Sequence, residues 1–562
     1  MKKFLFLITL LFVLASCARV GSPVGGSKDT IPPNVIGSNI DTPRVNVPTQ
    51  IKELRIDFDE YITLKNIQRN LIVSPPITVK KILPSSLANK FILIQWDETL
   101  QENTTYSFNF GSSIADSNEG NILPYHNFAF STGPEINDTY ISGEAKKVMD
   151  VSSNTSSTTE NKIVVGLYQL KDSMDYRQKP YYIAKADPDG YYELNYLSPG
   201  QYRVLAFEDE NLNSVYDAGK ESVGFLEEPV NLTESISGLN INLYPSRKVF
   251  KYVETKEIPG GVQMLFEGNP QKVEVESLNE KLTDYKVYHR PTSDTVYVWF
   301  DAQQSNIGIE NSENLKFRYQ TEKEEKEVSL FYRYNKNNEM VISNSRGNLV
   351  APNSDFTIRS NYHVASIQPE NWFLESDSIQ QSFTAKISET NPFEISISSA
   401  FEEGKKYSLT IPKETVLSHY ESTAKSYRFD FTIDKTENYG TLKLNLLNIP
   451  EEKFWLQLLK ENGDVAYSKY INQTEVIFSE ILPATYSLRI LVDNNGNGIW
   501  DSADFTNRIF AEDVYTFDKK VTVRPLWEIR ENWDVQPAAV SEPTSSEDSA
   551  NTEITPQNEE ED

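Results

Sequence analysis

The sequence is short of the residues that most catalytic and metal sites need. Cys17 is the only cysteine in 562 residues, which excludes disulfide bonds within the chain and sites built from several thiolates. The four histidines, His126, His289, His363 and His419, are isolated, and no His-x-x-x-His pair occurs. Gly-x-Ser-x-Gly and Gly-x-x-x-x-Gly-Lys motifs are also missing. We therefore expect a protein that is not an enzyme.

Positive charge is scarce as well. Lys and Arg number 54 against 81 Asp and Glu, which gives a formal net charge of −27 at pH 7. Such a surface repels phosphate groups, so it argues against nucleic acid as a partner and against electrostatic docking on anionic lipid headgroups. Hydrophobic residues still make up 38% of the chain, which is enough to build packed cores.

Long hydrophobic runs are missing except near the N-terminus. Lys2 and Lys3 precede an apolar run over residues 4–14, which is shorter than the ~20 residues of a membrane-spanning helix. The run ends in Leu-Ala-Ser-Cys at residues 14–17, which resembles the lipobox of bacterial lipoproteins. The resemblance implies acylation of Cys17 and a location in the bacterial cell envelope, at the outer membrane. An ordinary signal peptide with an incidental cysteine is the alternative.

The two ends of the remaining chain have the composition of unfolded segments. Residues 18–32 are rich in Gly, Ser and Pro, which is typical of a flexible tether. Residues 536–562 contain no Lys or Arg and end in Glu-Glu-Glu-Asp. Because such a segment cannot bury enough apolar area to fold, we expect a disordered acidic tail that keeps the protein soluble.

Between these ends the sequence favours β-strands. Runs such as Leu-Arg-Ile-Asp-Phe at 54–58 and Val-Tyr-Val-Trp-Phe at 296–300 alternate with period two, and turn residues such as Asp189-Gly190 separate them. Sustained helical periodicity is lacking. The prediction is an all-β chain of tandem β-sandwich modules, with sizes that suit one core each.

The segment 33–133 carries short motifs in a characteristic order. These are Ile-Asp-Phe-Asp-Glu-Tyr at 56–61, Ser-Pro at 74–75, Thr-Tyr at 105–106 and a closing Phe-Ala-Phe-Ser-Thr at 128–132. Together they resemble the bacterial Ig-like domain of the S-layer (SbsA) type. The closing motifs recur at 401–409 and 429–432, so residues 346–434 resemble a degenerate copy.

A second repeat follows each of these copies. It reads Gly-Tyr-Tyr-Glu-Leu at 190–194 with Leu-Ser-Pro-Gly-Gln-Tyr at 197–202, and Leu-Pro-Ala-Thr-Tyr at 482–486. This pattern resembles the transthyretin-like or Cna-B-like sandwich, also called the carboxypeptidase regulatory-like domain. The predicted units are a signal peptide at 1–17, a tether at 18–32, an Ig-like domain at 33–133, a transthyretin-like domain at 137–246, an unassigned β module at 247–345, a degenerate Ig-like domain at 346–434, a transthyretin-like domain at 435–535 and the tail at 536–562.

One motif has the chemistry of a cation site, and it follows the transthyretin-like hairpin both times. Residues 493–504 match the start of an EF-hand-like loop, with oxygen-bearing side chains at alternate positions and Gly498 at the sharp turn. The predicted calcium ligands are Asp493, Asn495, Asn497, the Ile499 carbonyl, Asp501 and Asp504.

The first copy of this motif is weaker as a calcium loop. Its candidate ligands are Asp209, Asn211, Asn213 and Asp217, but Ser214 replaces the glycine and Lys220 falls where the last carboxylate belongs, so Glu221 would have to substitute. In both copies the alternative is a turn whose Asn, Asp and Gly residues only satisfy backbone groups.

These features lead to one main expectation about function and two alternatives. We expect a lipid-anchored envelope protein whose modules act as a spacer or as docking surfaces for an envelope protein or polysaccharide. Binding of a carbohydrate or polymer through exposed aromatic residues, such as the pairs Tyr181-Tyr182 and Tyr191-Tyr192, is the first alternative. A hydrolase with an unrecognised carboxylate pair, of the kind seen at Asp59-Glu60 and Glu402-Glu403, is the last.

Overall fold

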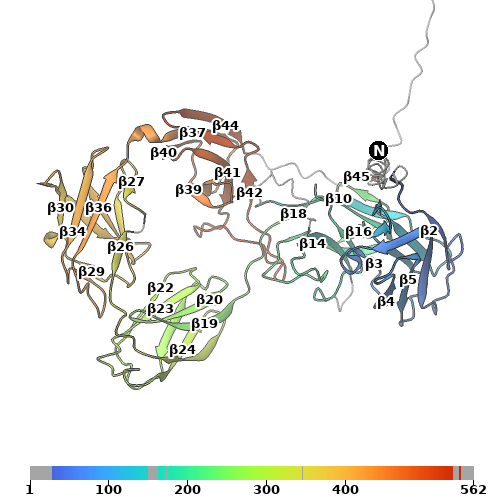
Figure 1. Ribbon diagram of the computed structural model, residues 1–562, viewed down its shortest axis with the longest axis horizontal. Helices are drawn as coiled ribbons and strands as arrows, with labels where there is room; N and C mark the ends of the chain where they lie inside the picture. The colour runs from blue at the N-terminus through green and yellow to red at the C-terminus, as the bar shows by residue number, and fades with distance from the viewer. Residues whose placement is uncertain (1–27, 150–161, 171–174, 345, 536–543, 546–562) are drawn as a thin grey trace, which may run out of the picture.

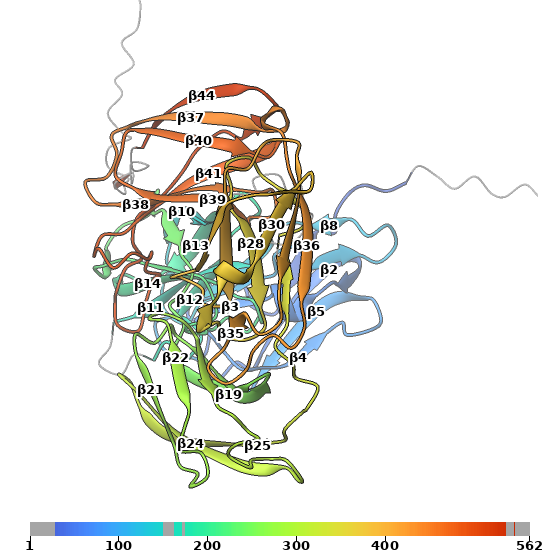
Figure 2. The same ribbon diagram turned by 90° about the vertical axis from the view of Figure 1, so that its left-hand side faces the viewer.

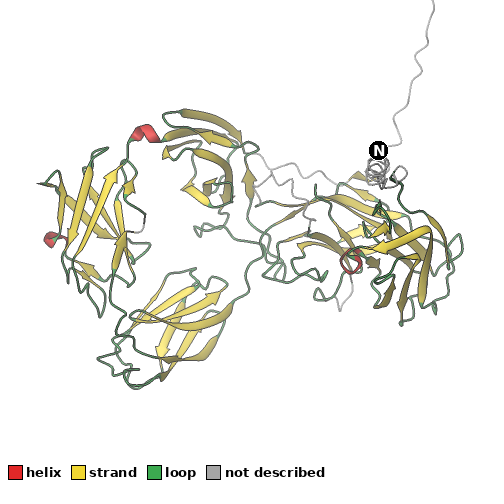
Figure 3. Cartoon of the chain, in the orientation of Figure 1, coloured by secondary structure: helices red, strands yellow, loops and turns green. Residues whose placement is uncertain are grey.

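The protein is a chain of five β-sandwiches. The computed structural model describes residues 28–149, 162–170, 175–344, 346–535 and 544–545. Nearly all of its regular structure is strand, with helical turns only at α2 (Ile67–Asn70), η1 (Pro369–Asn371) and η2 (Thr436–Asn438) (Figure 3). The predicted all-β fold of sandwich modules is thus confirmed. Cys17 and most of the acidic tail lie outside the described residues.

The first sandwich packs a large sheet against a small one. The large sheet has the order β4-β5-β2-β7-β8 with β1 on β2, and the small sheet is β3-β6-β9. Alternate residues of β2 (Leu54, Ile56 and Phe58) are buried between them, as period two predicts. The strands are β1 (Val35–Ser38), β2 (Glu53–Leu64), β3 (Ile72–Ser74), β4 (Val79–Leu83), β5 (Asn89–Trp96), β6 (Thr105–Asn109), β7 (Ile114–Asp116), β8 (Ile122–Leu123) and β9 (Asn127–Ser131).

The second sandwich has one sheet built on β10 and another built on β11 and β14. In the first sheet β13 pairs antiparallel and β17 and β18 pair parallel with β10. The second sheet has the order β12-β11-β14-β15, with β16 also on β14. The strands are β10 (Thr139–Lys147), β11 (Ile163–Gln169), β12 (Tyr182–Lys185), β13 (Tyr191–Leu197), β14 (Gly200–Glu208), β15 (Val223–Phe225), β16 (Val230–Leu232), β17 (Ile236–Ser237) and β18 (Ile241–Leu243).

The fifth sandwich repeats the pairing of the second. β37 pairs antiparallel with β40 and parallel with β44, and β38 pairs with β39 and β41, which also receives β42 and β43. One tyrosine contact recurs too: Tyr202 and Tyr486 each donate a hydrogen bond to the carbonyl four residues earlier, over 2.8 Å. The strands are β37 (Gly440–Leu447), β38 (Phe454–Leu459), β39 (Val465–Ile471), β40 (Glu475–Ile481), β41 (Ala484–Val492), β42 (Val514–Thr516), β43 (Val521–Val523) and β44 (Glu528–Asp534).

The third sandwich fills the segment that the sequence left unassigned. Its sheets are β19-β20-β23-β22 and β21-β24-β25, and they enclose a core of their own around Met264, Phe317 and Tyr319. The strands are β19 (Lys251–Ile258), β20 (Gly261–Glu267), β21 (Val273–Ser277), β22 (Lys286–His289), β23 (Thr295–Trp299), β24 (Glu313–Thr321) and β25 (Glu325–Tyr332).

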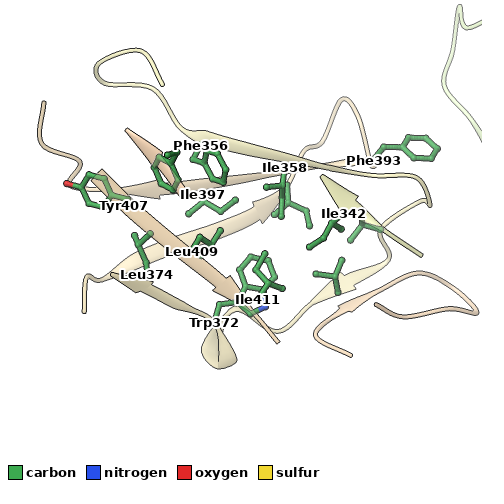
Figure 4. Close-up of a cluster of buried hydrophobic side chains, with 14 of the residues drawn as sticks. Ile342, Phe356, Ile358, Trp372, Leu374, Phe393, Ile397, Tyr407, Leu409 and Ile411 are labelled. Atoms are coloured by element: carbon green, nitrogen blue, oxygen red, sulfur yellow. The ribbon is translucent and has the colours of Figure 1, made fainter. Parts of the chain in front are cut away.

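The fourth sandwich has the sheets β26-β28-β33-β32 and β27-β36-β34-β30-β31, with the small pair β29-β35. Side chains such as Phe356, Ile397 and Leu409 meet between its sheets (Figure 4). Met340 and Ile342 belong to the same core, so this sandwich begins a few residues before the predicted boundary at 346. The strands are β26 (Ile342–Asn344), β27 (Leu349–Val350), β28 (Phe356–Ser360), β29 (Ser366–Ile367), β30 (Phe373–Ser376), β31 (Ile379–Gln380), β32 (Phe383–Ile387), β33 (Glu394–Ser399), β34 (Lys406–Ile411), β35 (Val416–Leu417) and β36 (Tyr427–Ile433).

The third and fourth sandwiches share buried aromatic residues. Trp299, at the end of β23, belongs to the core cluster of the fourth sandwich and lies near Tyr362 and Phe393 of that sandwich. Gly260 of the third sandwich makes this approach possible, because a Cβ there would lie 2.2 Å from the Tyr362 ring. These two sandwiches therefore form a tight joint.

The five sandwiches do not run on in an extended line. The chain leaves the second sandwich, passes through the third and fourth, and returns with the fifth, one loop of which contacts the second sandwich (Figures 1 and 2). The short strand β45 (Thr544–Ser545) also pairs with β17 of the second sandwich. Within the described part of the chain, helices of membrane-spanning length and hydrophobicity are absent.

Candidate functional site

The second of the two cation-type loops spans residues 493–513, between β41 and β42. Asp493 is buried at its base, and its carboxylate accepts backbone N–H groups from Asn497 at 3.0 Å and Gly498 at 2.7 Å. The Tyr470 hydroxyl donates to the same carboxylate at 2.5 Å. Burial acts to raise the pKa of Asp493, but these hydrogen bonds outweigh it and lower the pKa. Asp493 is therefore held as a carboxylate.

The next polar side chains of this second loop lie together. Asn495 and Asn497 donate their side-chain amides to Asp501, over 2.7 and 2.8 Å. The Asn497 side-chain oxygen accepts the backbone N–H of Ile499 at 2.9 Å. Asp504 lies elsewhere: its carboxylate accepts hydrogen bonds from Asn507, and its backbone pairs with Ile509. The loop thus brings together four predicted ligands with side-chain oxygens, without Asp504.

A buried glutamate that is not among the predicted ligands also belongs to this loop. Glu512 accepts backbone N–H groups from Asn494 at 2.8 Å and Asn495 at 3.2 Å through one oxygen, and from Asp501 at 2.8 Å through the other. Burial raises the pKa of Glu512. Because Glu512 lies eight residues beyond Asp504, the spacing of an EF-hand motif does not point to it.

The first loop, residues 209–222 between β14 and β15, has the same internal contacts. Asp209 is buried and accepts the N–H groups of Asn213 and Ser214, both at 2.9 Å. Asn211 donates to Asp217 at 2.6 Å, as Asn495 does to Asp501. Ser214 adopts the left-handed conformation (φ 60°) that Gly498 adopts in the second loop (φ 83°). The serine therefore does not change the shape of the loop.

Glu221 takes the place in the first loop that Glu512 takes in the second. It accepts the N–H groups of Glu210 at 3.1 Å and Asp217 at 2.8 Å. Burial raises the pKa of Glu221 to about 7. Glu221 thus takes the position of the last carboxylate in the first loop, as the sequence indicated.

The chemistry of both loops fits a hard cation, with oxygens from one aspartate at the base, two asparagines, a second aspartate and a glutamate. Within the described residues, no group of three or more His, Cys, Asp or Glu side chains is placed to hold a metal ion. The carboxylates and amides are engaged with backbone N–H groups and with one another, as the alternative of a structural turn requires. Calcium binding stays a prediction.

The other candidate groups do not form a catalytic arrangement within the described residues. Glu421 and Asp301 lie beside a cavity of about 20 Å³ between the third and fourth sandwiches, where burial and the Asp301 charge raise the pKa of Glu421. A cavity of that size holds about one water molecule rather than a substrate. His363 and His419, far apart in sequence, stack at 4.8 Å in the same joint, and burial lowers the pKa of His363 to about 4.

The tyrosine pairs do not make a flat sugar-stacking platform. The rings of Tyr181 and Tyr182 are nearly perpendicular, at 87°, and Tyr182 is buried. Tyr192 is buried as well, while Tyr191 is exposed and donates a hydrogen bond to Glu193. Tyr181, Tyr182 and Tyr192 pack the second sandwich, and Tyr181 also donates to Gln101 of the first sandwich at 3.0 Å.

The first sandwich has a groove of about 940 Å³ between the edge strands of its two sheets. Its lining mixes aliphatic and polar side chains, with Ile67, Ile77 and Ile82 among the aliphatic ones. Its charged lining residues are Arg69, Lys80, Lys81 and, from the second sandwich, Lys179, and no carboxylate lines it. Lys80 pairs with Asp97 just outside the groove at 3.3 Å. In a chain with a net charge of −27 this groove is a locally basic surface.

Comparison with known proteins identifies the first sandwich. Residues 29–132 match the family model of the bacterial Ig-like domain. The first sandwich is a bacterial Ig-like domain. This match confirms the resemblance inferred from the motifs of residues 33–133. A search of curated proteins gave no match for the chain.

Solved structures similar to the chain include other multi-domain proteins. Surface layer protein SbsC (domains 1–6) is 10% identical over 88% of this chain and 67% of that one, with a TM-score of 0.14. The Bacillus anthracis TIE protein is 11% identical over 94% and 78%, with a TM-score of 0.12. The Bacteroides ovatus SGBP-B in complex with a mixed-linkage heptasaccharide is 10% identical over 69% and 94%, with a TM-score of 0.19.

Proposed function

We propose that this protein is a lipid-anchored, non-enzymatic docking protein of the bacterial cell envelope. The observation that carries the proposal is the construction of the chain: an Ig-like domain followed by four further sandwiches, each with its own packed core. Such a chain supplies a large surface on which a partner can dock. The single cysteine at the end of the apolar N-terminal run supports acylation at Cys17.

Docking has more support than a spacer role. A spacer gains reach when its modules follow one another in line, whereas here the fifth sandwich returns to the second. The groove on the first sandwich supports docking further, because a concave surface lined by both aliphatic and basic side chains is one that a partner's side chains can fill. A sugar-binding role has less support than docking, because the rings of Tyr181 and Tyr182 are nearly perpendicular.

The anchor is tested by replacing the acylated residue. Cys17→Ser should move the protein from the membrane fraction to the soluble fraction and abolish incorporation of radiolabelled palmitate. Ser16→Ala is the matched control, because it keeps a small residue before the cysteine and should leave the protein in the membrane. If the Cys17→Ser protein still pellets with membranes after a high-salt wash, the anchor is wrong.

The non-enzymatic role is tested separately. A Glu421→Gln protein should fully complement every envelope phenotype of a deletion strain. The Glu421 carboxylate lines a cavity that is too small for a substrate, so its loss should not affect function. A Glu421→Gln protein that is stably folded, present at the normal level and unable to complement would overturn this part of the proposal.

A further inference from the structure

The two repeated loops, which lie almost 300 residues apart in the sequence, meet in space. Phe505 of the second loop inserts among aromatic side chains of the second sandwich: its ring centroid lies 4.5 Å from Tyr176, 5.8 Å from Tyr216 and 5.2 Å from Phe225. Phe510 stacks on Phe225 at 4.6 Å. Phe505, Tyr216 and Phe225 belong to one buried cluster that two sandwiches share, and Tyr176 packs against it.

Backbone contacts fix the position of the second loop on the second sandwich. Arg247 donates its backbone N–H to the Ala503 carbonyl at 2.6 Å, and Ser246 and Ala503 pair as a parallel β-bridge. The Arg508 side chain donates to the Tyr176 hydroxyl at 3.0 Å. Ala503 and Phe505 are only 2% and 6% exposed. The contact is therefore specific in register as well as apolar.

The arm that makes this contact exists only in the second loop. The second loop spans residues 493–513 and the first only 209–222, and the additional residues of the second loop include Phe505 and Phe510. Glu512 holds the base of the arm, since it accepts the Asp501 N–H and its carbonyl accepts the Trp500 indole N–H at 3.0 Å. A rigid base thus presents the two phenylalanines of the arm to the second sandwich.

We propose that the arm, residues 500–510, is a latch that reversibly closes the second to fifth sandwiches into a ring. The latch is a loop packed against the second sandwich, and its rim is open to solvent, because Ile509 and Phe510 are 45% and 47% exposed. Such contacts open at lower free energy than the cores of the sandwiches do. Opening frees the fifth sandwich from the second, and it exposes an aromatic surface formed by Tyr168, Tyr176, Tyr216 and Phe225.

A cysteine pair across the latch tests closure directly in the full chain. In a Cys17→Ser background, which has no other thiol, Ser246→Cys and Ala503→Cys place two thiols on bridge partners, and neighbouring strands lie about 4.8 Å apart, within disulfide range. The pair Thr485→Cys and Thr522→Cys is the matched positive control, because these partners lie on adjacent strands inside the fifth sandwich. We expect both pairs to form intramolecular disulfides under mild oxidation.

The latch is then weakened without touching either cysteine pair. Phe505→Ala with Phe510→Ala should slow formation of the 246–503 disulfide on the order of tenfold or more, because most of the apolar contact is lost, and leave the 485–522 disulfide unchanged. Phe331→Ala, a truncation of a phenylalanine that is 75% exposed on the third sandwich, is the control and should change neither rate. Small-angle scattering should show a larger maximum dimension for the double-alanine protein.

Three results would overturn the latch. The first is failure of the 246–503 pair to crosslink while the 485–522 pair does. The second is a 246–503 disulfide that forms at the same rate with and without Phe505 and Phe510. The third is a 246–503 disulfide that forms only between two molecules, because the contact would then belong to an assembly of chains and not to a ring.

Discussion

The first and second loops share their internal contacts but differ in what they do between sandwiches. Both hold a buried aspartate at the base and a buried glutamate that binds backbone N–H groups, and both have the same pair of residues with positive φ: Leu212 and Ser214 in the first, Gly496 and Gly498 in the second. They differ in the arm, which only the second loop carries. The shared contacts therefore maintain the loop itself, and the arm is free to form the joint between sandwiches.

We expect the largest loss of stability when the buried aspartate at the base of either loop is replaced. Asp493→Ala leaves the N–H groups of Asn497 and Gly498 and the Tyr470 hydroxyl without their acceptor, which should cost roughly 2–4 kcal/mol of local stability in the fifth sandwich. Asp209→Ala should cost somewhat less in the second sandwich, because no hydroxyl donates to Asp209 there. Hydrogen exchange of the full chain, read separately over each loop, measures both. Equal protection of wild type and Asp493→Ala would contradict the structure of the second loop.

The next largest expected effect is a difference between the two loops in how much calcium stabilises them. At 10 mM calcium, and with dissociation constants of ~10⁻⁴–10⁻³ M as in extracellular modules, binding would add about 1.4–2.7 kcal/mol to the second loop. The first loop should gain less, because Leu212 and Ser214 are strained where the second loop has glycine. Asp493→Ala should remove the gain. Thermal unfolding with calcium, with the same concentration of magnesium, and with chelator is the measurement. Identical midpoints with calcium and chelator would leave both loops as structural turns.

The buried glutamates give the loops a pH dependence in the presence of chelator. Since burial raises the pKa of Glu221 to about 7, folding favours its protonated form, and stability should fall as the pH rises from about 4.5 to about 7, by roughly 1–2 kcal/mol. Glu221→Gln should flatten that slope for the second sandwich only. Glu228→Gln, at an exposed position, is the control. If stability still falls with pH in the Glu221→Gln protein, another titrating group causes the pH dependence.

Exchanging the turn residues should give the smallest effect. Ser214→Gly should stabilise the first loop, and Gly498→Ser should destabilise the second, each by about 0.5–1 kcal/mol, because both positions have positive φ. A Cβ at Gly498 meets no atom within 4 Å, so that change tests backbone conformation alone. Chemical denaturation of the two reciprocal variants measures it. Effects of the same sign in both loops would contradict this account.

Much of the fold was predictable because it depends on local patterns. Period-two runs such as residues 54–58 mark strands, and the closing Phe-x-Phe motif of residues 128–132 marks the Ig-like domain. The two transthyretin-like repeats led to two sandwiches with the same strand pairing. Such patterns record neighbours along a strand or across a hairpin, and these are the contacts that strand periodicity and turn chemistry encode.

The contacts between distant segments were not predictable. No sequence motif marks Glu512 or Phe505. Their roles depend on the path of an irregular loop, which brings Glu512 back to the backbone of residues 494–501 and Phe505 to the second sandwich. His363 and His419 are isolated in the sequence, yet they stack in the joint between the third and fourth sandwiches. Asp504 fits the spacing of an EF-hand motif, but it lies within the arm, where its carboxylate accepts hydrogen bonds from Asn507 instead.

The pairing of β45 with β17 has a practical consequence for engineering. The first described residues belong to the first sandwich, and the last described residues, in β45, pair with the second. An epitope inserted in the exposed turn at residues 377–378 of the fourth sandwich would accordingly be displayed on a different sandwich from the one that pairs with β45.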